Sequence, residues 1–124
     1  MSVAALCLVA GAMTATVPTA RFTLAWQHSV EKVLWEEDYL VAGAWLYATG
    51  ARIRGSGAGM EPPDGAVLKD AAWRYRPASR WLRELTLARS TFTPDYRLCF
   101  DGRCAPLSRW IPLEAGVTTL RPCP

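Results

Sequence analysis

Hydrophobic and polar residues alternate with a period of two along much of this chain. The first clear run has Phe22, Leu24 and Trp26 in one phase, with smaller or polar residues between them. Such alternation is typical of a β-strand with one buried face. We expect further strands at residues 36–41, 44–53, 71–75, 84–90, 97–100, 103–107, 110–113 and 117–120. The pattern predicts a protein built largely from short strands.

Turn-forming residues separate these strands. Gly43 accepts a positive φ angle, so residues 42–44 can form a tight turn that joins strands 36–41 and 44–53 as a hairpin. Prolines punctuate the later strands and confine them to edges, strand ends or bulges, because proline has no N–H for a ladder. Only residues 79–87 have a spacing that allows a turn or two of helix. The pattern predicts an all-β fold, a single antiparallel β-sandwich or partly open barrel of about eight short strands.

The amino-terminal segment differs from the rest of the chain. Residues 2–17 carry no charge, and their apolar run is shorter than the about 20 residues that span a bilayer. The segment resembles an export signal, with small-residue cleavage patterns ending at Ala12 and, less well, at Ala15 or Ala20. An uncleaved anchor and a first buried element of the domain are the alternatives. We expect an export signal or short anchor at residues 1–20 and a single β domain at residues 21–124.

Composition and charge exclude several classes of protein. Hydrophobic residues make up 51% of the chain and charged residues 20%, which argues against disorder and against a multi-span membrane protein. The net charge of +3 is spread along the chain rather than gathered in a basic stripe, so nucleic-acid binding is not expected. No cofactor is expected either. Any membrane contact is expected only through the N-terminal segment, if it stays uncleaved.

The cysteines give the sharpest local prediction. Asp101-Gly102 favours a type I′ hairpin, which pairs Cys99 with Cys104 at a non-hydrogen-bonded position where α-carbons lie about 4.5 Å apart. That separation suits a disulfide. A redox pair or two metal ligands are alternatives, but export favours the structural disulfide. Cys7 would be lost with the signal, which would leave Cys123 as an odd thiol.

Residues 28–39 hold the only histidine and a run of carboxylates. If the first strand continues through this stretch, His28 and Ser29 point to opposite faces, so a serine triad is not supported. A metal site could combine His28 with Glu31, Glu36 or Glu37, but one histidine without defined spacing is a weak signal, and the metal stays unknown. A strand, a turn and a second strand with an acidic outer side is the plain alternative.

A glycine-rich loop is the second candidate. Successive N–H groups of Gly55, Gly57 and Gly59 could form an anion-binding concavity beside Arg52 and Arg54. No helix can follow the loop, so it is not a dinucleotide-binding fingerprint. A flexible loop whose glycines serve only geometry is the alternative. The candidate ligand-binding residues are therefore His28, Ser29, Glu31, Glu36, Arg54, Gly55, Gly57 and Gly59, and no residue is assigned a catalytic role.

These motifs together resemble a known family. A strand ending in His-Ser-Val-Glu, a nearby Trp-Glu-Glu-x-Tyr and a Gly-Ser-Gly-Ala-Gly-Met loop are similar to the proteins catalogued as domain of unknown function 1850, over residues 22–113. Members are often encoded beside tripartite TRAP transporters of the TAXI type. The resemblance implies an exported accessory to solute uptake, with a TRAP transporter component or a small solute as partner. It implies no activity for the candidate residues.

Two functions follow as hypotheses. The first is a periplasmic or envelope domain that binds a small solute, an ion or a transporter component without catalysis. The alternative is an envelope hydrolase or lyase that uses His28 with Glu31 or Glu36. An enzyme would need a base within about 3 Å of the atom that it deprotonates, inside a pocket that excludes water.

Overall fold

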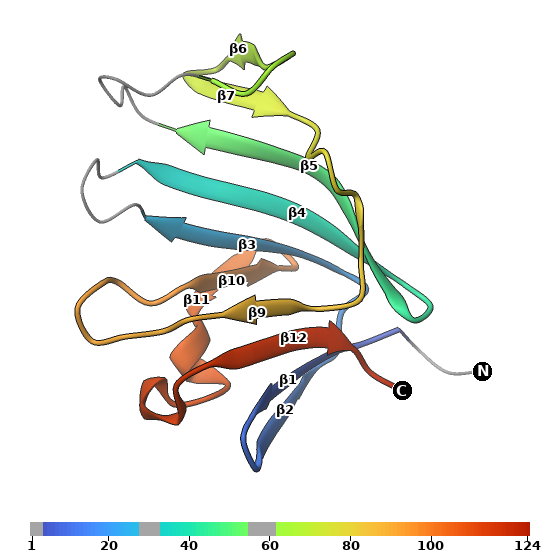
Figure 1. Cartoon of the computed structure of the whole chain (residues 1–124), viewed down its shortest axis with the longest axis vertical. Coiled ribbons are helices and arrows are strands. Elements are labelled where there is room, and N and C mark those ends of the chain that lie inside the picture. Colours follow the sequence, from blue (N-terminus) through green and yellow to red (C-terminus); the bar gives the residue numbers. More distant parts are fainter. Residues whose placement is uncertain (1–3, 28–32, 55–61) are drawn as a thin grey trace.

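The computed structural model describes residues 4–27, 33–54 and 62–124, which form two antiparallel sheets (Figure 1). The large sheet has the order β11-β10-β3-β4-β5-β7-β6, with β8 also paired to β5. Its strands are β3 (Arg21–Gln27), β4 (Leu34–Ala42), β5 (Trp45–Arg54), β6 (Val67–Lys69), β7 (Ala72–Tyr75), β8 (Trp81–Leu82), β10 (Arg97–Phe100) and β11 (Arg103–Pro106). The small sheet has the order β2-β1-β12-β9. Its strands are β1 (Leu6–Ala10), β2 (Met13–Val17), β9 (Leu85–Leu87) and β12 (Thr118–Pro122).

The all-β prediction is confirmed, and so are its two main hairpins. β4 and β5 pair through the expected turn, where Gly43 has a φ of +62°. At the second hairpin Asp101 and Gly102 both have positive φ, as a type I′ turn requires. Cys99 lies opposite Cys104, and the two form a disulfide with α-carbons 4.0 Å apart.

The amino-terminal segment is part of the small sheet. β1 and β2 form a hairpin, and β1 also pairs with β12 near the C-terminus. Leu6, Leu8 and Val17 are fully buried. This is the arrangement of the third alternative for the segment, a first buried element of the domain.

A second disulfide joins the two ends of the chain. Cys7 on β1 and Cys123, just after β12, are bonded, with α-carbons 5.0 Å apart. The expectation of an odd thiol at Cys123 is therefore wrong. The pairing depends on the strand contact between β1 and β12, which local sequence cannot show because the two cysteines are 116 residues apart.

The hydrophobic core lies between the small sheet and one half of the large sheet. Leu6, Leu8 and Leu120 from the small sheet pack in the same cluster as Phe22 and Tyr39 from the large one. Along β4 and β5 this cluster includes residues near the β4–β5 turn but not Glu37, Ala51 or Ile53. The inner face of the large sheet therefore continues beyond the part that the core cluster covers.

Two local expectations are wrong. Residues 79–87 contain strands β8 and β9 rather than helix, because pairing with β5 and β12 outweighs a weak helical spacing. Residues 110–113 are not a strand, since they lie beside two 3₁₀ turns at Leu107–Arg109 and Leu113–Ala115. No helix in the described part of the chain is long and apolar enough to span a membrane.

Buried Arg89 fixes the loops between β9 and β12. Its guanidinium pairs with both carboxylate oxygens of Asp95, at 2.9 and 3.0 Å. It also donates to the Thr118 hydroxyl at 3.0 Å and to the carbonyls of Ile111 and Pro112 at 2.8 and 3.3 Å. All five N–H donors of an arginine thus have an acceptor. The sequence pattern gave no sign of this network.

Candidate functional site

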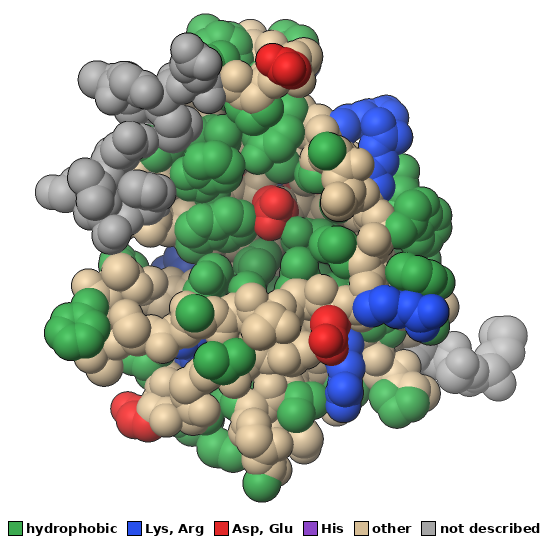
Figure 2. Space-filling model, in the orientation of Figure 1, with side chains coloured by type: hydrophobic (Ala, Val, Ile, Leu, Met, Phe, Trp, Pro, Cys, Tyr) green, Lys and Arg blue, Asp and Glu red, His purple; other side chains and the backbone are tan. Residues whose placement is uncertain are grey.

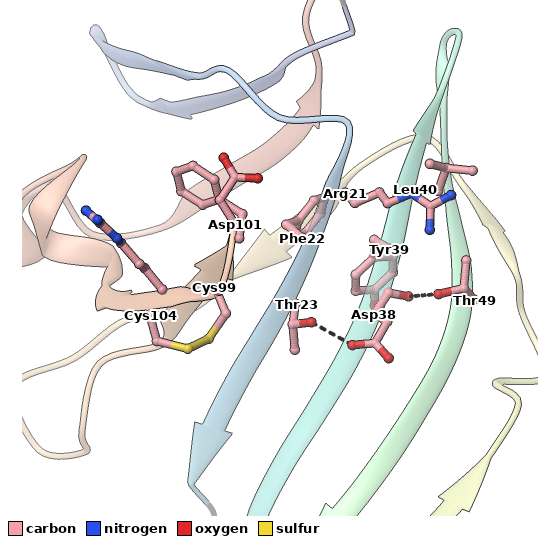
Figure 3. Close-up of a pocket in the computed structure, with 13 residues that line it drawn as sticks. Arg21, Phe22, Thr23, Asp38, Tyr39, Leu40, Thr49, Cys99, Asp101 and Cys104 are labelled. Atoms are coloured by element: carbon pink, nitrogen blue, oxygen red, sulfur yellow. Dashed lines mark hydrogen bonds between the residues drawn. A yellow bond between two sulfur atoms is a disulfide. The ribbon is translucent and has the colours of Figure 1, made fainter.

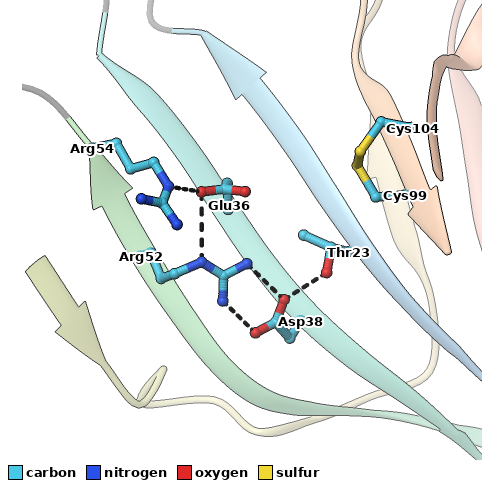
Figure 4. The surroundings of a disulfide bond; sticks show 7 residues. All are labelled: Thr23, Glu36, Asp38, Arg52, Arg54, Cys99 and Cys104. Carbon is cyan, nitrogen blue, oxygen red and sulfur yellow. Dashed lines mark hydrogen bonds and ion pairs between the residues drawn. A yellow bond between two sulfur atoms is a disulfide. The ribbon is translucent and has the colours of Figure 1, made fainter. Parts of the chain in front are cut away.

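The outer face of the large sheet carries a ladder of ion pairs that runs across β3, β4 and β5 (Figure 4). Arg54 donates to Glu36 at 2.5 Å, and Arg52 lies 3.5 Å from the same carboxylate. Arg52 also pairs with both oxygens of Asp38, at 2.5 and 3.0 Å. The Thr23 hydroxyl donates to Asp38 at 2.6 Å. Each outer carboxylate of the ladder therefore already has a cationic partner.

The ladder stabilises the charged form of its carboxylates. Burial alone would raise the pKa of Asp38, but the hydrogen bonds from Arg52 and Thr23 outweigh it and hold that pKa below its ordinary value. The same hydrogen bond to Asp38 raises the pKa of Arg52. A carboxylate held ionised by a bidentate arginine is a poor general base, because its proton affinity is low. The ladder is thus suited to holding β3, β4 and β5 in register and to neutralising the charges on the outer face of the sheet.

A groove of about 530 Å³ lies beside the ladder, between β4 and the β10–β11 hairpin. Figure 3 shows Thr23, Asp38 and Thr49 on one side and the Cys99–Cys104 disulfide on the other. The Thr49 hydroxyl donates to the backbone carbonyl of Asp38 at 3.3 Å. The groove has both polar and apolar lining residues, and the contacts just described already engage the polar side chains of Thr23, Asp38 and Thr49.

The inner face of the same strand holds a different carboxylate, that of Glu37. By strand register Glu37 lies between Leu24 of β3 and Ala51 of β5, both buried, and Tyr75 of β7 is the next residue along this row. Trp35 and Tyr39, two positions away on β4, share its face. Glu37 is therefore surrounded by apolar and aromatic side chains.

Glu37 has a hydrogen bond but no ion pair among the described residues. The Tyr39 hydroxyl donates to its Oε1 at 2.8 Å. Burial raises the pKa of Glu37, and the Tyr39 hydroxyl only partly offsets that effect. Burial, reinforced by the Glu37 charge, also raises the pKa values of Tyr39 and Tyr75. A half-buried carboxylate without a cationic partner is costly, which makes it the most unusual charged group in the described chain.

A row of aromatic side chains lies next to Glu37 on the inner face. Across β3, β4, β5 and β7 the residues that face one another are Trp26, Trp35, Ile53 and Trp73. The rings of Trp26 and Trp35 are stacked, with centroids 6.1 Å apart. Figure 2 shows hydrophobic side chains gathered over β4, β5 and β7, with an acidic side chain among them. We call Glu37, Tyr39, Tyr75, Trp26, Trp35 and Trp73 the aromatic cradle.

The candidate ligand-binding residues predicted from sequence fall in two groups. Six of them lie outside the described residues, namely His28, Ser29, Glu31, Gly55, Gly57 and Gly59. Glu36 and Arg54 are described, and they bind each other on the outer face.

Sequence reasoning named Glu37 only as a possible metal ligand and left it out of the candidate ligand-binding residues, although a signal for its unusual position was present. Trp35, Glu37, Tyr39 and Val41 occupy alternate positions of one strand, so Glu37 is a carboxylate in an otherwise apolar phase. No three His, Cys, Asp or Glu side chains come together as metal ligands within the described ranges, and His28 and Glu31 of the expected metal site lie outside those ranges.

The fold and this site define a small protein of two packed antiparallel sheets, with a neutralised outer face and an aromatic inner face. Comparison with known proteins gives its family. The model of a family described as a domain of unknown function, DUF1850, matches residues 22–107, so the chain belongs to that family. No curated protein and no solved structure matches the chain. The resemblance inferred from the sequence motifs is confirmed.

Proposed function

We propose that this protein is an exported, non-catalytic binding domain of the cell envelope that takes a small organic cation in the aromatic cradle. The observation that carries the proposal is Glu37, a half-buried carboxylate that has aromatic neighbours and no ion pair among the described residues. Buried charges in proteins are normally paired, so a ligand cation would complete this site. Aromatic faces add cation–π attraction for an ammonium group.

The geometry favours binding over catalysis. Glu36 and Asp38 are held by Arg54 and Arg52, so the outer carboxylates are committed to ion pairs. Among the described residues the hydrogen-bond partner of Glu37 is the Tyr39 hydroxyl, and burial raises the pKa of that hydroxyl far above neutral pH. A strongly basic phenolate is not formed at neutral pH, so this pair supplies an acceptor and a donor for a ligand and no ready nucleophile.

Export is supported by the cysteines. Both disulfides hint at an oxidising compartment outside the cytoplasm, because such bonds are rare in reducing ones. The Cys7–Cys123 bond favours a form that keeps residues 6–17. Fractionation of the native host followed by mass spectrometry tests this. We expect an envelope protein with both disulfides and an intact N-terminal hairpin, and a reduced cytoplasmic protein would contradict it.

The association with solute uptake rests on family membership. Proteins of this family are often encoded beside TRAP transporters of the TAXI type, so we propose a component of such a transporter as partner. Affinity purification of the full chain from native membranes, with and without crosslinking, tests the association. Recovery of the transporter's membrane subunit is expected. Its absence from crosslinked samples that contain other envelope proteins would contradict the proposal.

Ligand binding is tested by thermal unfolding with tetramethylammonium, ethanolamine and putrescine, with succinate as an anionic comparison. A ligand that binds only the folded state stabilises it by RT ln(1 + L/Kd), where L is the ligand concentration, so the melting temperature rises with the logarithm of that concentration once it exceeds Kd. We expect at least one ammonium compound to stabilise the wild type and to lose this effect in Glu37→Gln. Exposed Glu114 offers a matched control, since Glu114→Gln removes the same charge from a 3₁₀ turn. Equal stabilisation of all three proteins would refute the site, and so would no stabilisation of any of them.

A further inference from the structure

An exposed group of aromatic side chains lies at the start of β5 and on β8, away from the aromatic cradle. Trp81 is 58% exposed and Trp45 is 37% exposed, although tryptophan is usually well buried. Their ring centroids are 6.4 Å apart at an interplanar angle of 82°, and the Tyr47 ring is 4.6 Å from that of Trp81. We call Trp45, Tyr47 and Trp81 the aromatic edge.

Basic side chains flank the aromatic edge. The Arg83 guanidinium lies over the Trp45 ring, 4.1 Å from its centroid. Arg83 and Arg121 both line a groove of about 690 Å³ that also includes the β4–β5 turn and the C-terminal residues. Glu84 is the acidic residue that lines the groove. In Figures 1 and 2 the β4–β5 turn and the C-terminus share one corner, where basic side chains stand beside hydrophobic ones.

We infer that the aromatic edge is a membrane-docking surface that binds the headgroup region of an anionic lipid bilayer. Tryptophan and tyrosine are enriched at this depth of a membrane because their rings are apolar and carry one polar group. Two arginines, Arg83 and Arg121, against one glutamate complement a negative surface. The Arg83 guanidinium lies over the Trp45 ring, so its charge is held at the aromatic edge, where it can contact lipid phosphate.

The arrangement of the rings favours a lipid interface over a folded protein partner. The three rings meet at steep angles, 82° and 52°, so they present no flat surface for close packing against a second sheet. A fluid headgroup layer adapts to such a shape, whereas protein interfaces need close complementarity at their core. The aromatic edge and the inner face of the large sheet are on different parts of the molecule. Docking at this edge would therefore hold the protein beside a membrane partner without covering the inner face.

The test is cosedimentation of the full chain with vesicles, either pure phosphatidylcholine or phosphatidylcholine mixed with phosphatidylglycerol. We expect binding to the anionic vesicles, weaker binding at high salt and little binding to the neutral ones. Arg83→Gln and Arg121→Gln should each lower the partition coefficient about fivefold, the equivalent of the interaction of one basic residue with an anionic surface. Trp45→Ser with Trp81→Ser should abolish binding.

The molecule offers matched controls at exposed positions elsewhere. Phe92 is 93% exposed in the loop after β9, and Arg109 is exposed in the first 3₁₀ turn. Phe92→Ser and Arg109→Gln should leave the partition coefficient unchanged, and circular dichroism should show every variant folded. The inference is refuted if the wild type does not bind anionic vesicles, or if control and edge substitutions have equal effects. It is also refuted if edge substitutions only dissociate a dimer in solution.

Discussion

Replacing Arg89 or Asp95 should destabilise the protein unequally. Breaking a buried ion pair from one side costs about 3–5 kcal/mol of unfolding free energy, because the remaining charge is left without its partner. The Arg89 side chain is 0% exposed, whereas that of Asp95 is 12% exposed. Asp95 also accepts backbone N–H bonds from Tyr96 and Ser108, both at 3.0 Å. After Arg89→Met, Asp95 would keep these two donors and some contact with water.

Substitution of Asp95 removes more interactions than substitution of Arg89. Asp95→Leu leaves a fully buried guanidinium with only neutral acceptors and also strands the N–H groups of Tyr96 and Ser108. We expect a loss of about 3 kcal/mol for Arg89→Met and about 5 kcal/mol for Asp95→Leu, the two ends of the range for a broken buried pair. The double variant should lose less than the sum, because no unpaired charge remains.

Urea unfolding followed by tryptophan fluorescence measures all three losses against the wild type, provided that the m-values agree. Equal losses for the two single variants would refute the reasoning about residual partners. Losses below about 1 kcal/mol would refute the buried pair itself, since exposed ion pairs contribute no more than that. Arg97→Met, at an exposed arginine of β10, is the control and should have little effect.

Three further outcomes follow from the structure. Replacing Cys99 and Cys104 with serine should cost about 2 kcal/mol in the chain-entropy model, while replacing Cys7 and Cys123 should cost about 5 kcal/mol because that loop is far longer. Equal losses in denaturant would show that loop length does not govern the difference. Burial gives Glu37 a higher pKa in the folded protein than its ordinary value of 4.5. The contribution of this group to the free energy of unfolding is therefore fully present below pH 4.5 and is lost as pH rises through the folded pKa. Glu37→Gln should therefore gain stability relative to the wild type from pH 4 to 7, and a constant difference would contradict this. Ammonium binding should weaken as pH falls over the same range.

Local sequence determined the strands and hairpins that depend on neighbouring residues. Alternation placed β3, and Gly43 and the Asp101-Gly102 pair marked the two main turns with the correct register. The same register correctly brought Cys99 opposite Cys104. These features could be predicted because side-chain period and turn chemistry act over a few residues.

The candidate site was predicted only in part. Glu36 and Arg54 were selected from the acidic stretch and the glycine-rich loop, but their mutual ion pair depends on the pairing of β4 with β5. The sequence named Glu37 only as a possible metal ligand, since alternation shows that Glu36 and Glu37 face opposite ways but not which face is covered. Packing decides that question, because it buries Leu24 and Ala51, the residues on either side of Glu37.

The tertiary structure alone decided the features that join distant parts of the chain. Cys7 meets Cys123 only because β1 and β12 are neighbours, and Arg89 reaches Thr118 only because β9 pairs with β12. The uncharged, apolar composition of residues 2–17 suggested an export signal. The same composition is also compatible with the buried hairpin that β1 and β2 form. The sequence by itself determined the fold class, the turns and the family of this protein, since these follow from local pattern and motif. Which faces are buried, and which charges lack a partner, depend on packing between segments that sequence separates.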